Sequence, residues 1–174
     1  MNQIIRVSRT GGPEVLQPDV QRLSKPRAGE VQVRILAAGV NFVDTYYRSG
    51  LYPSALPFIP GSEMCGEVVA LGGKVSDFAV GDRVATATAR TGCYAQYVNV
   101  PATKLVKVPK GLEPERVAGM MLKGMTAQYL LRQVYKVGAD DTILVHAAAG
   151  GVGQIMVQWA KALGATVIGT VGSP

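Results

Sequence analysis

Residues 144–153 read Leu-Val-His-Ala-Ala-Ala-Gly-Gly-Val-Gly, and this stretch decides the fold of the C-terminal part of the chain. It overlaps the apolar run 142–145, which is typical of a buried parallel strand. It leads into residues 154–163, which favour a helix closed by Gly164. A second apolar run follows over residues 165–171. A strand, a helix and a strand in this order form the unit that places a pyrophosphate at a helix N-terminus.

The loop within this unit has the spacing Ala148-x-Gly150-x-x-Gly153, with alanine where the dinucleotide fingerprint has its first glycine. Gly150 would let the backbone approach the phosphates, and Gly153 would let the helix pack closely on the strand. The backbone N–H groups near Gly151 and Val152, together with the helix dipole, would favour an anion. Because the flanking strands and helix are all present, we interpret the loop as phosphate-binding.

The end of the second apolar run bears on the choice of nucleotide. NAD sites usually place Asp or Glu there, about twenty residues past the glycines, to bind the ribose 2′-OH. This chain has no carboxylate at that point, and Thr170 and Ser173 offer hydroxyl donors instead. The sequence therefore predicts NADPH as the cofactor. The cation that pairs with the 2′-phosphate is expected just past Pro174.

The position of this unit predicts that the chain belongs to a longer enzyme. A complete dinucleotide-binding domain contains two such halves, whereas most of these 174 residues precede the glycine loop. An exposed parallel strand edge is also an aggregation hazard. We therefore expect a truncated form or fragment with little activity alone.

Composition places the chain among globular proteins, because it is 48% hydrophobic and 17% charged. The net charge of +6 is spread along the chain without a dense basic cluster, which gives nucleic-acid binding little support. No apolar run reaches the length of a membrane span. Cys65 and Cys93 form no CxxC pair, and reduced thiols in a cytoplasmic protein are the simplest interpretation.

The sequence before residue 113 predicts β structure. Alternation over residues 30–37 puts four side chains on one face of a strand: Val31, Val33, Ile35 and Ala37. Further strands are expected near residues 4–8, 63–70, 84–88 and 94–100. Short strands at regular spacing suggest a small irregular barrel or sandwich.

Helix signals begin at residues 113–115, where proline and two acids suit a first turn. Thr126 is expected to cap the following helix, whose apolar stripe includes Leu130 and Val134. We therefore divide the chain into a β-rich domain over residues 1–125 and the start of a nucleotide-binding domain over residues 126–174.

Ordered motifs also run through nearly the whole chain. They are AGVNFVDTY at 38–46, RSGLY at 48–52, PGSE at 60–63, GDRV at 81–84, KGMTA at 123–127 and HAAAGGVG at 146–153. In this order they resemble the quinone oxidoreductase branch of the medium-chain dehydrogenase/reductase superfamily, the ζ-crystallin-like enzymes.

That resemblance implies a mixed α/β fold, in which a GroES-like β-barrel domain is followed by the first β-α-β unit of a Rossmann domain. It implies an NADPH-dependent enzyme that transfers hydride to a quinone or a related α,β-unsaturated carbonyl. It also implies a homodimer of the full-length enzyme. The C-terminal half of the family pattern is absent from this sequence.

The resemblance further implies chemistry without a metal. Zinc members of the superfamily place Cys where this chain has Asn41, and His where it has Ser62. They also carry a four-cysteine lobe for which this chain lacks the cysteines. Zinc needs several thiolate or imidazole ligands, and His146 is the only histidine. We interpret His146 as structural.

The resemblance also assigns roles to individual residues. Asn41 and Tyr46 would contact the nicotinamide or its ribose, and Tyr52 would line the substrate pocket. Lys123 and Thr126 would approach the nicotinamide end. The predicted catalytic residues are Asn41, Tyr46 and Tyr52. The predicted cofactor-binding residues are Asn41, Tyr46, Lys123, Thr126, Ala149, Gly150, Gly151, Val152, Gly153, Thr170, Gly172 and Ser173.

Structural alternatives stay open for most of these side chains. Asn41 would also suit a helix cap, and either tyrosine would also suit packing. Lys123 would also suit a solvated surface. Asp44 is interpreted as a first-turn acid, and the residue pair Tyr94 and Tyr97 is assigned to strand packing alone.

Two other classes of function remain beside the enzyme. Some members of the family bind RNA, and a non-catalytic remnant would keep only the β-rich domain. Steeply salt-dependent RNA binding would favour the first of these, whereas NADPH binding that is insensitive to salt favours the enzyme.

Overall fold

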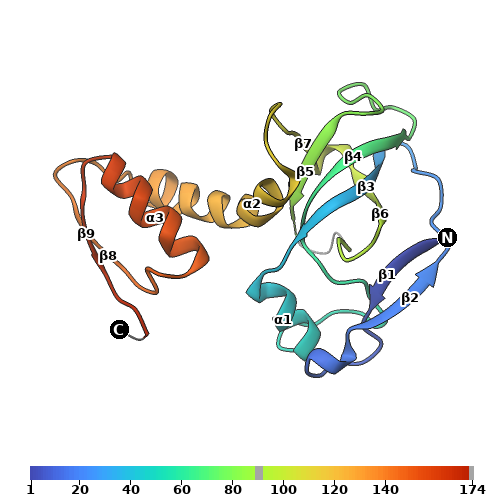
Figure 1. The fold of residues 1–174 in the computed structure, drawn as a ribbon, viewed down its shortest axis with the longest axis horizontal. Helices are drawn as coiled ribbons and strands as arrows, with labels where there is room; N and C mark the ends of the chain where they lie inside the picture. Colours follow the sequence, from blue (N-terminus) through green and yellow to red (C-terminus); the bar gives the residue numbers. More distant parts are fainter. Residues whose placement is uncertain (89–91, 173–174) are drawn as a thin grey trace. The chain divides into compact units, whose positions relative to one another are not determined.

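The computed structural model describes residues 1–88 and 92–172 and divides the chain into two compact units (Figure 1). The first unit comprises Met1–Met121 and the second Leu122–Pro174. No helix of the described residues is long and apolar enough to cross a membrane. Each unit has its own hydrophobic core, and each is described separately below.

The first unit contains two antiparallel sheets. One pairs β1 (Asn2–Arg6) with β2 (Gln17–Gln21), which follow one another across the 3-10 turn η1 (Pro13–Val15). The other has the strand order β6-β3-β4-β5-β7. Its strands are β3 (Glu30–Gly39), β4 (Glu63–Leu71), β5 (Arg83–Ala87), β6 (Tyr97–Pro101) and β7 (Val106–Lys107), with the 3-10 turn η2 (Ala102–Lys104) between the last two.

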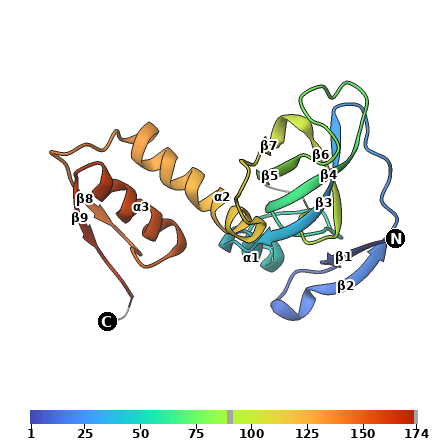
Figure 2. The same ribbon diagram turned by 45° about the horizontal axis from the view of Figure 1, so that its top comes forward.

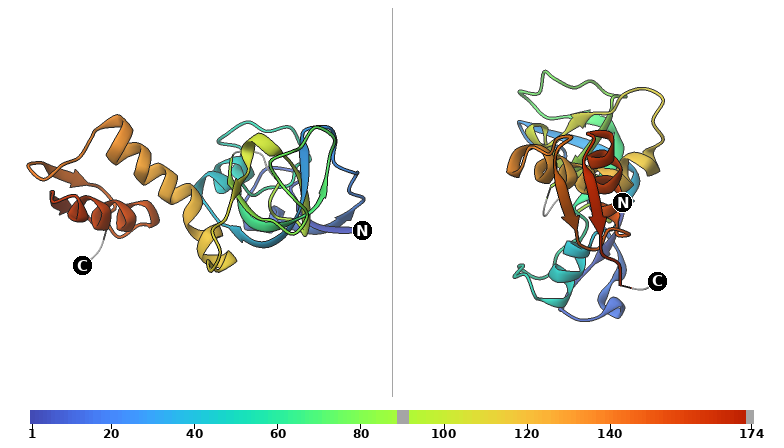
Figure 3. Two further views of the ribbon diagram at one scale, coloured as in Figure 1. Left: turned by 90° about the horizontal axis from the view of Figure 1, so that it is seen from above. Right: turned by 90° about the vertical axis from the view of Figure 1, so that its left-hand side faces the viewer.

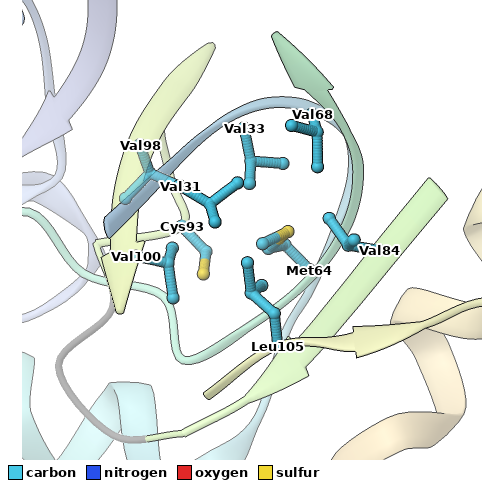
Figure 4. Packing of buried hydrophobic residues seen from close by; sticks show 9 residues of the cluster. All are labelled: Val31, Val33, Met64, Val68, Val84, Cys93, Val98, Val100 and Leu105. Atoms are coloured by element: carbon cyan, nitrogen blue, oxygen red, sulfur yellow. The ribbon is translucent and has the colours of Figure 1, made fainter. Parts of the chain in front are cut away.

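The main core lies against one side of this five-stranded sheet. Figure 4 shows valines of β3, β4, β5 and β6 directed toward one another around Met64 and Leu105. Val31 and Val33 are fully buried there, and Ile35 packs against the same cluster. The alternation of β3 thus places its apolar side chains as the sequence predicts, because successive side chains of a strand point to opposite faces.

Ala37 is the exception to that alternation. The register between β3 and β4 shifts between Ile35 and Ala37, so Ala37 is paired with Cys65. An extra residue in one strand of a pair changes which face the following side chains occupy. Ala37 accordingly packs in a second cluster, with Cys65, Ala85 and Val117, and the expectation that it shares one face with Val31 and Val33 was wrong.

Two helices follow strands of the first unit. Two residues separate the end of β3 from helix α1 (Phe42–Ser49). Helix α2 (Pro114–Gln128) begins at Pro114, as the proline and acid signals predict, and continues as the π-helix η3 (Tyr129–Val134). Thr126 therefore lies inside α2, and its hydroxyl donates to the carbonyl of Leu122 at 2.7 Å. The prediction that Thr126 caps a new helix was wrong, because α2 continues through position 126 and the hydroxyl bonds back to its own helix.

The second unit contains the β-α-β element that the sequence predicts. Strands β8 (Thr142–Val145) and β9 (Thr166–Gly169) pair in parallel, with Thr142 opposite Thr166. Helix α3 (Gly151–Ala162) lies along one side of this sheet, as Figures 2 and 3 show. Leu131, Val137, Ala160 and Ala165 form a buried core, and Ile143 of β8 and Val167 of β9 pack against it. The helix begins three residues earlier than predicted, so Gly151 and Gly153 lie in its first turn.

Candidate functional site

Asn41 lies where β3 gives way to α1, and its conformation follows from that position. It is the N-cap of α1, with extended backbone angles of φ −130° and ψ 152°. Its side chain is buried, and its amide Nδ2 donates to the carboxylate Oε2 of Glu63 at 2.7 Å. Glu63 is brought there by the sheet, because it is paired with Gly39 at the end of β3. Asn41 is thus both a helix cap and part of a buried polar contact.

Close backbone packing surrounds this contact. A Cβ atom added at Gly39 would overlap both the Glu63 carboxylate and the backbone oxygen of Ala118 in α2. Glycine at position 39 is therefore what allows Glu63 and α2 to approach the end of β3 so closely. Gly39, two residues before Asn41, therefore shapes the site because it has no side chain.

Asp44 collects three hydrogen bonds at the start of α1. Its Oδ2 accepts from the backbone N–H of Asn41 and from the hydroxyl of Tyr94, both at 3.0 Å, and its Oδ1 accepts from the hydroxyl of Ser62 at 3.2 Å. The bond to Asn41 is half of a capping box, which is the first-turn role that the sequence predicts. The other two bonds join α1 to segments 18 and 50 residues away in sequence.

Tyr94 is part of this cluster and does more than pack. Burial, reinforced by the neighbouring Asp44 carboxylate, raises the pKa of the Tyr94 phenol well above its ordinary range. The phenol therefore remains a hydrogen-bond donor to Asp44. The sequence interpretation, which gave Tyr94 only a packing role, was wrong. Its partners are remote in sequence, and the PGSE motif at 60–63, which contains Ser62, was the sequence signal available for this cluster.

Tyr46 and Tyr52 form an aromatic group with Tyr47. The rings of Tyr46 and Tyr52 meet edge to face with centroids 5.3 Å apart, and those of Tyr47 and Tyr52 are 5.6 Å apart. The backbone N–H of Tyr52 donates to the carbonyl of Tyr46 at 3.1 Å, which holds the segment after α1 against the helix. Tyr52 is 44% exposed. The structure thus brings the two predicted tyrosines together on one surface of the first unit, whereas Asn41 is buried.

The glycine loop of the second unit makes a tight turn between β8 and α3. Ala147 has a positive φ of 51°, and the N–H of Gly150 donates to its carbonyl at 2.8 Å. A Cβ atom at Gly153 would lie 2.7 Å from the Cα of Ala148. Gly153 thus allows α3 to pack closely on the loop after β8, at Ala147 and Ala148, whereas the sequence predicted close packing on the strand itself. The first N–H groups of a helix lack partners within it, so the start of α3 presents backbone donors, and this loop fits a pyrophosphate.

Lys123 lies beside this loop. A Cβ atom at Gly151 would lie 2.9 Å from Cδ and 3.0 Å from Cε of Lys123, so the lysine stem covers the first residue of α3. Two predicted cofactor-binding residues, Lys123 and Gly151, are therefore adjacent within the second unit. The hydroxyl of Thr126, by contrast, is engaged by its own helix.

Thr170 follows β9 and is tied to the loop from the other side. Its carbonyl accepts from the N–H of Ala148 at 2.9 Å, and its hydroxyl lies 3.0 Å from Nδ1 of His146. His146 is exposed, and its hydrogen bond with Thr170 joins the ends of β8 and β9. Gly172 is exposed, and Ser173 lies outside the described residues.

The residues at the superfamily's zinc positions are engaged with carboxylates. The Asn41 amide donates to Glu63, and the Ser62 hydroxyl donates to Asp44. Within residues 1–88 and 92–172, no group of three or more His, Cys, Asp or Glu side chains is placed to hold a metal ion.

Comparisons with known proteins agree with this arrangement. The alcohol dehydrogenase GroES-like domain family matches residues 27–110. A quinone oxidoreductase of Pseudomonas aeruginosa is 53% identical over 175 residues, which cover 100% of this chain and 54% of that protein. A 2-haloacrylate reductase of Burkholderia sp is 48% identical, over 96% of this chain and 52% of that protein.

Solved structures give the same result. The structure of Escherichia coli quinone oxidoreductase complexed with NADPH matches 99% of this chain and 53% of its own, with a TM-score of 0.95 and 45% identity. This chain thus spans about half the length of the relatives it matches. The ordered motifs, the GroES-like match and these identities lead to one conclusion: over nearly its whole length the chain is similar to proteins named quinone oxidoreductases, and its residues 27–110 match the GroES-like domain of alcohol dehydrogenases.

Proposed function

We propose that this chain carries part of an NADPH-dependent quinone oxidoreductase that works without zinc. The observation that carries the proposal is the glycine loop between β8 and α3, whose close packing at Gly153 suits a dinucleotide pyrophosphate. It is supported by the 45% identical Escherichia coli structure, which is a quinone oxidoreductase complexed with NADPH. The substrate class is a quinone or a related α,β-unsaturated carbonyl, since the Burkholderia relative is named a 2-haloacrylate reductase.

The residues of the second unit would hold the phosphates. Backbone N–H groups of Gly151, Val152 and Gly153 are directed along the axis of α3, where the helix dipole favours an anion. Lys123 adds a cation whose stem already lies against Gly151. Ala149 and Gly150 complete the turn. NADPH, when bound, supplies the hydride, and these residues supply position and charge compensation.

The end of β9 supports NADPH over NADH. No Asp or Glu occurs from Thr166 to Gly172, so no carboxylate there would repel a 2′-phosphate. The hydroxyl of Thr170 and the imidazole of His146, 3.0 Å apart, offer hydrogen-bonding groups at the strand ends. We expect the protein to bind NADPH at least tenfold more tightly than NADH, measured by the quenching of Trp159 fluorescence or by calorimetry. Equal affinity for the two would contradict this cofactor assignment.

In the first unit, we assign Asn41, Tyr46 and Tyr52 to the nicotinamide and the substrate. Reduction of a quinone develops negative charge on its oxygens, which hydrogen-bond donors stabilise. The phenols of Tyr46 and Tyr52 are such donors, and their edge-to-face contact fixes their positions. Asn41 is held by Glu63, so its amide has one orientation. No residue of this set requires a metal ion.

The partners that we propose are a small-molecule substrate and a second copy of the complete enzyme. We also propose a cytoplasmic location, supported by the two buried free thiols of Cys65 and Cys93, which suit a reducing compartment.

A chimera tests the proposed activity. Residues 1–174 would be joined to the C-terminal part of the Pseudomonas aeruginosa relative, which is 53% identical over the shared region. We expect the chimera to oxidise NADPH with 1,4-benzoquinone at more than about 1 per second, within the usual range for enzymes. The 174-residue chain alone is the comparison, and we expect at least tenfold slower turnover from it. A chimera that folds and binds NADPH but does not reduce the quinone would contradict the proposed reaction.

A further inference from the structure

The first unit contains a cavity that the proposed function does not use. Its volume is about 460 Å³, within the range of small-molecule sites. It is walled by the end of β1, the end of β2, helix α1 and the segment 54–62, all within the first unit. The residues that matter for the argument are Arg6, Gln21, Asp44, Tyr47, Phe58 and Ser62.

One wall of the cavity is an acceptor. Asp44 and Ser62 both line it, and the Ser62 hydroxyl donates to Asp44 at 3.2 Å. The carboxylate is held in place by two further donors, the N–H of Asn41 and the hydroxyl of Tyr94. A fixed carboxylate repels anions and accepts hydrogen bonds from O–H or N–H groups. This wall therefore suits a ligand hydroxyl.

Another wall carries Arg6, which forms an ion pair with the Asp19 carboxylate. Arg6 lines the cavity beside Gln21, and two contacts hold its guanidinium: Nε donates to Asp19, and Nη2 donates to Gln21 at 3.4 Å. A guanidinium has five N–H donors, so these two bonds leave donors for a third partner. Arginine in a fixed position is well suited to bind a carboxylate.

The lining of the cavity also includes apolar side chains, which suit a ring-shaped group. They belong to Pro57, Phe58, Ile59 and Pro60. Flat aromatic rings bury apolar area against such side chains at low conformational cost. A ligand that satisfies the whole cavity has an apolar ring, a hydroxyl group and an anionic group.

We propose that this cavity binds a small aromatic carboxylate that carries a ring hydroxyl, with the carboxylate on Arg6 and the hydroxyl on Asp44 and Ser62. The site lies wholly within the first unit. The proposal does not rest on the oxidoreductase function, because binding is measured without NADPH and without quinone.

Calorimetric titration of the 174-residue chain with 4-hydroxybenzoate tests the proposal. We expect saturable binding with one site per chain. Two matched ligands separate the contacts: 4-methoxybenzoate lacks the hydroxyl hydrogen, and methyl 4-hydroxybenzoate lacks the charge. Each is expected to bind at least tenfold more weakly. Absence of saturable binding, or equal affinity for the three compounds, would overturn the proposal.

Variants locate the site. Arg6→Gln is expected to weaken binding of 4-hydroxybenzoate at least tenfold while leaving the affinity for the methyl ester unchanged. Arg34→Gln is the control, because Arg34 forms an exposed ion pair with Glu67 and does not line the cavity. If Arg34→Gln weakens binding as much as Arg6→Gln, the binding is nonspecific charge attraction and the proposal fails. If Arg6→Gln folds poorly, the relative affinities of the three ligands for the unmodified chain still test the proposal.

Discussion

At the scale of single residues, the first unit depends on a carboxylate that is almost completely removed from water. Asp44 is 6% exposed, and burying a charged group costs free energy unless it is hydrogen-bonded. Its three donors come from Asn41, Ser62 and Tyr94, which belong to three separate segments of the chain. The cost of burial is thus offset by bonds that also fix how those segments meet.

Replacing Asp44 with asparagine tests this arrangement. The amide nitrogen of Asp44→Asn would meet at least one group that now donates to the carboxylate. We expect the free energy of unfolding to fall by about 1–3 kcal/mol, the cost of leaving a buried donor unsatisfied. Urea denaturation measures it. Asp77→Asn is the control, since Asp77 is exposed and accepts a hydrogen bond from its neighbour Ser76; a similar loss in both variants would contradict the argument.

Tyr94 gives a prediction about pH. Because burial and the Asp44 carboxylate raise the pKa of its phenol, the folded protein keeps this proton at a pH where the unfolded chain, with an ordinary tyrosine, loses it. The unfolded state then binds fewer protons, so the stability of the protein falls as the pH rises above about 10.

Tyrosine ionisation, followed by ultraviolet absorbance, checks this. Of the seven tyrosines, we expect one phenol to ionise only when the protein unfolds in alkali. The variant Tyr94→Phe should lack that late step and should lose stability less steeply above pH 10. Tyr97→Phe serves as the control. A late step that persists in Tyr94→Phe would assign it to another tyrosine.

At the scale of elements, the sequence predicts what is local and misses what is remote. The β8-α3-β9 unit was predicted because its signals lie within one stretch of chain: an apolar run, the glycine loop and a second apolar run. The expected cap at Thr126 was wrong because local helix signals do not show where neighbouring helical segments merge. The bulge in β3 was missed because it depends on pairing with β4.

In the candidate site, too, the features encoded in one stretch of chain were predicted, and the contacts between remote residues were not. The glycine loop and Lys123 were predicted, and the structure places Lys123 against Gly151. The hydrogen bonds of Asp44 to Ser62 and Tyr94 were not predicted, because they join residues 18 and 50 positions apart. Such contacts arise from the register of the whole sheet, which alternation within one strand cannot supply.

We expect alanine substitutions at two helical glycines to change the free energy of unfolding in opposite directions. Gly153→Ala would force a Cβ to 2.7 Å from the Cα of Ala148, so we expect a loss of about 1–3 kcal/mol from overpacking and at least tenfold weaker NADPH binding. Gly119→Ala is the matched control. Position 119 is exposed in α2 with open space around a Cβ, so we expect a gain of about 0.5–1 kcal/mol. Chemical denaturation and NADPH titration of both variants measure these effects. Equal stability changes would show that the loop tolerates a side chain.

At the scale of the whole molecule, the two units differ in how their strands are supported. In the first unit, β3 and β4 each pair with strands on both sides and cover a large buried core. In the second, β8 and β9 form a sheet of two strands, and Leu144 and Ile168 are more than half exposed. Regions with few buried apolar contacts open more readily, so the units should differ in local stability.

Hydrogen exchange with and without NADPH tests this difference together with the cofactor assignment. Without NADPH, we expect amides of β8 and β9 to exchange at least about tenfold faster than those of β3 and β4, because less buried apolar surface opposes their opening. Binding restricted to the folded state, at 100 times the Kd, stabilises a protein by about 2.7 kcal/mol, which corresponds to about 100-fold slower exchange through unfolding. NADPH should therefore slow exchange in β8, β9 and the start of α3 by up to this factor, while β3 and β4 change less than twofold.

NADH at the same concentration is the control and should slow the exchange of these amides less than NADPH does. Uniform slowing across both units would show that NADPH stabilises the chain without using the glycine loop, and unchanged exchange in β8 and β9 at saturation would remove the loop from the NADPH site.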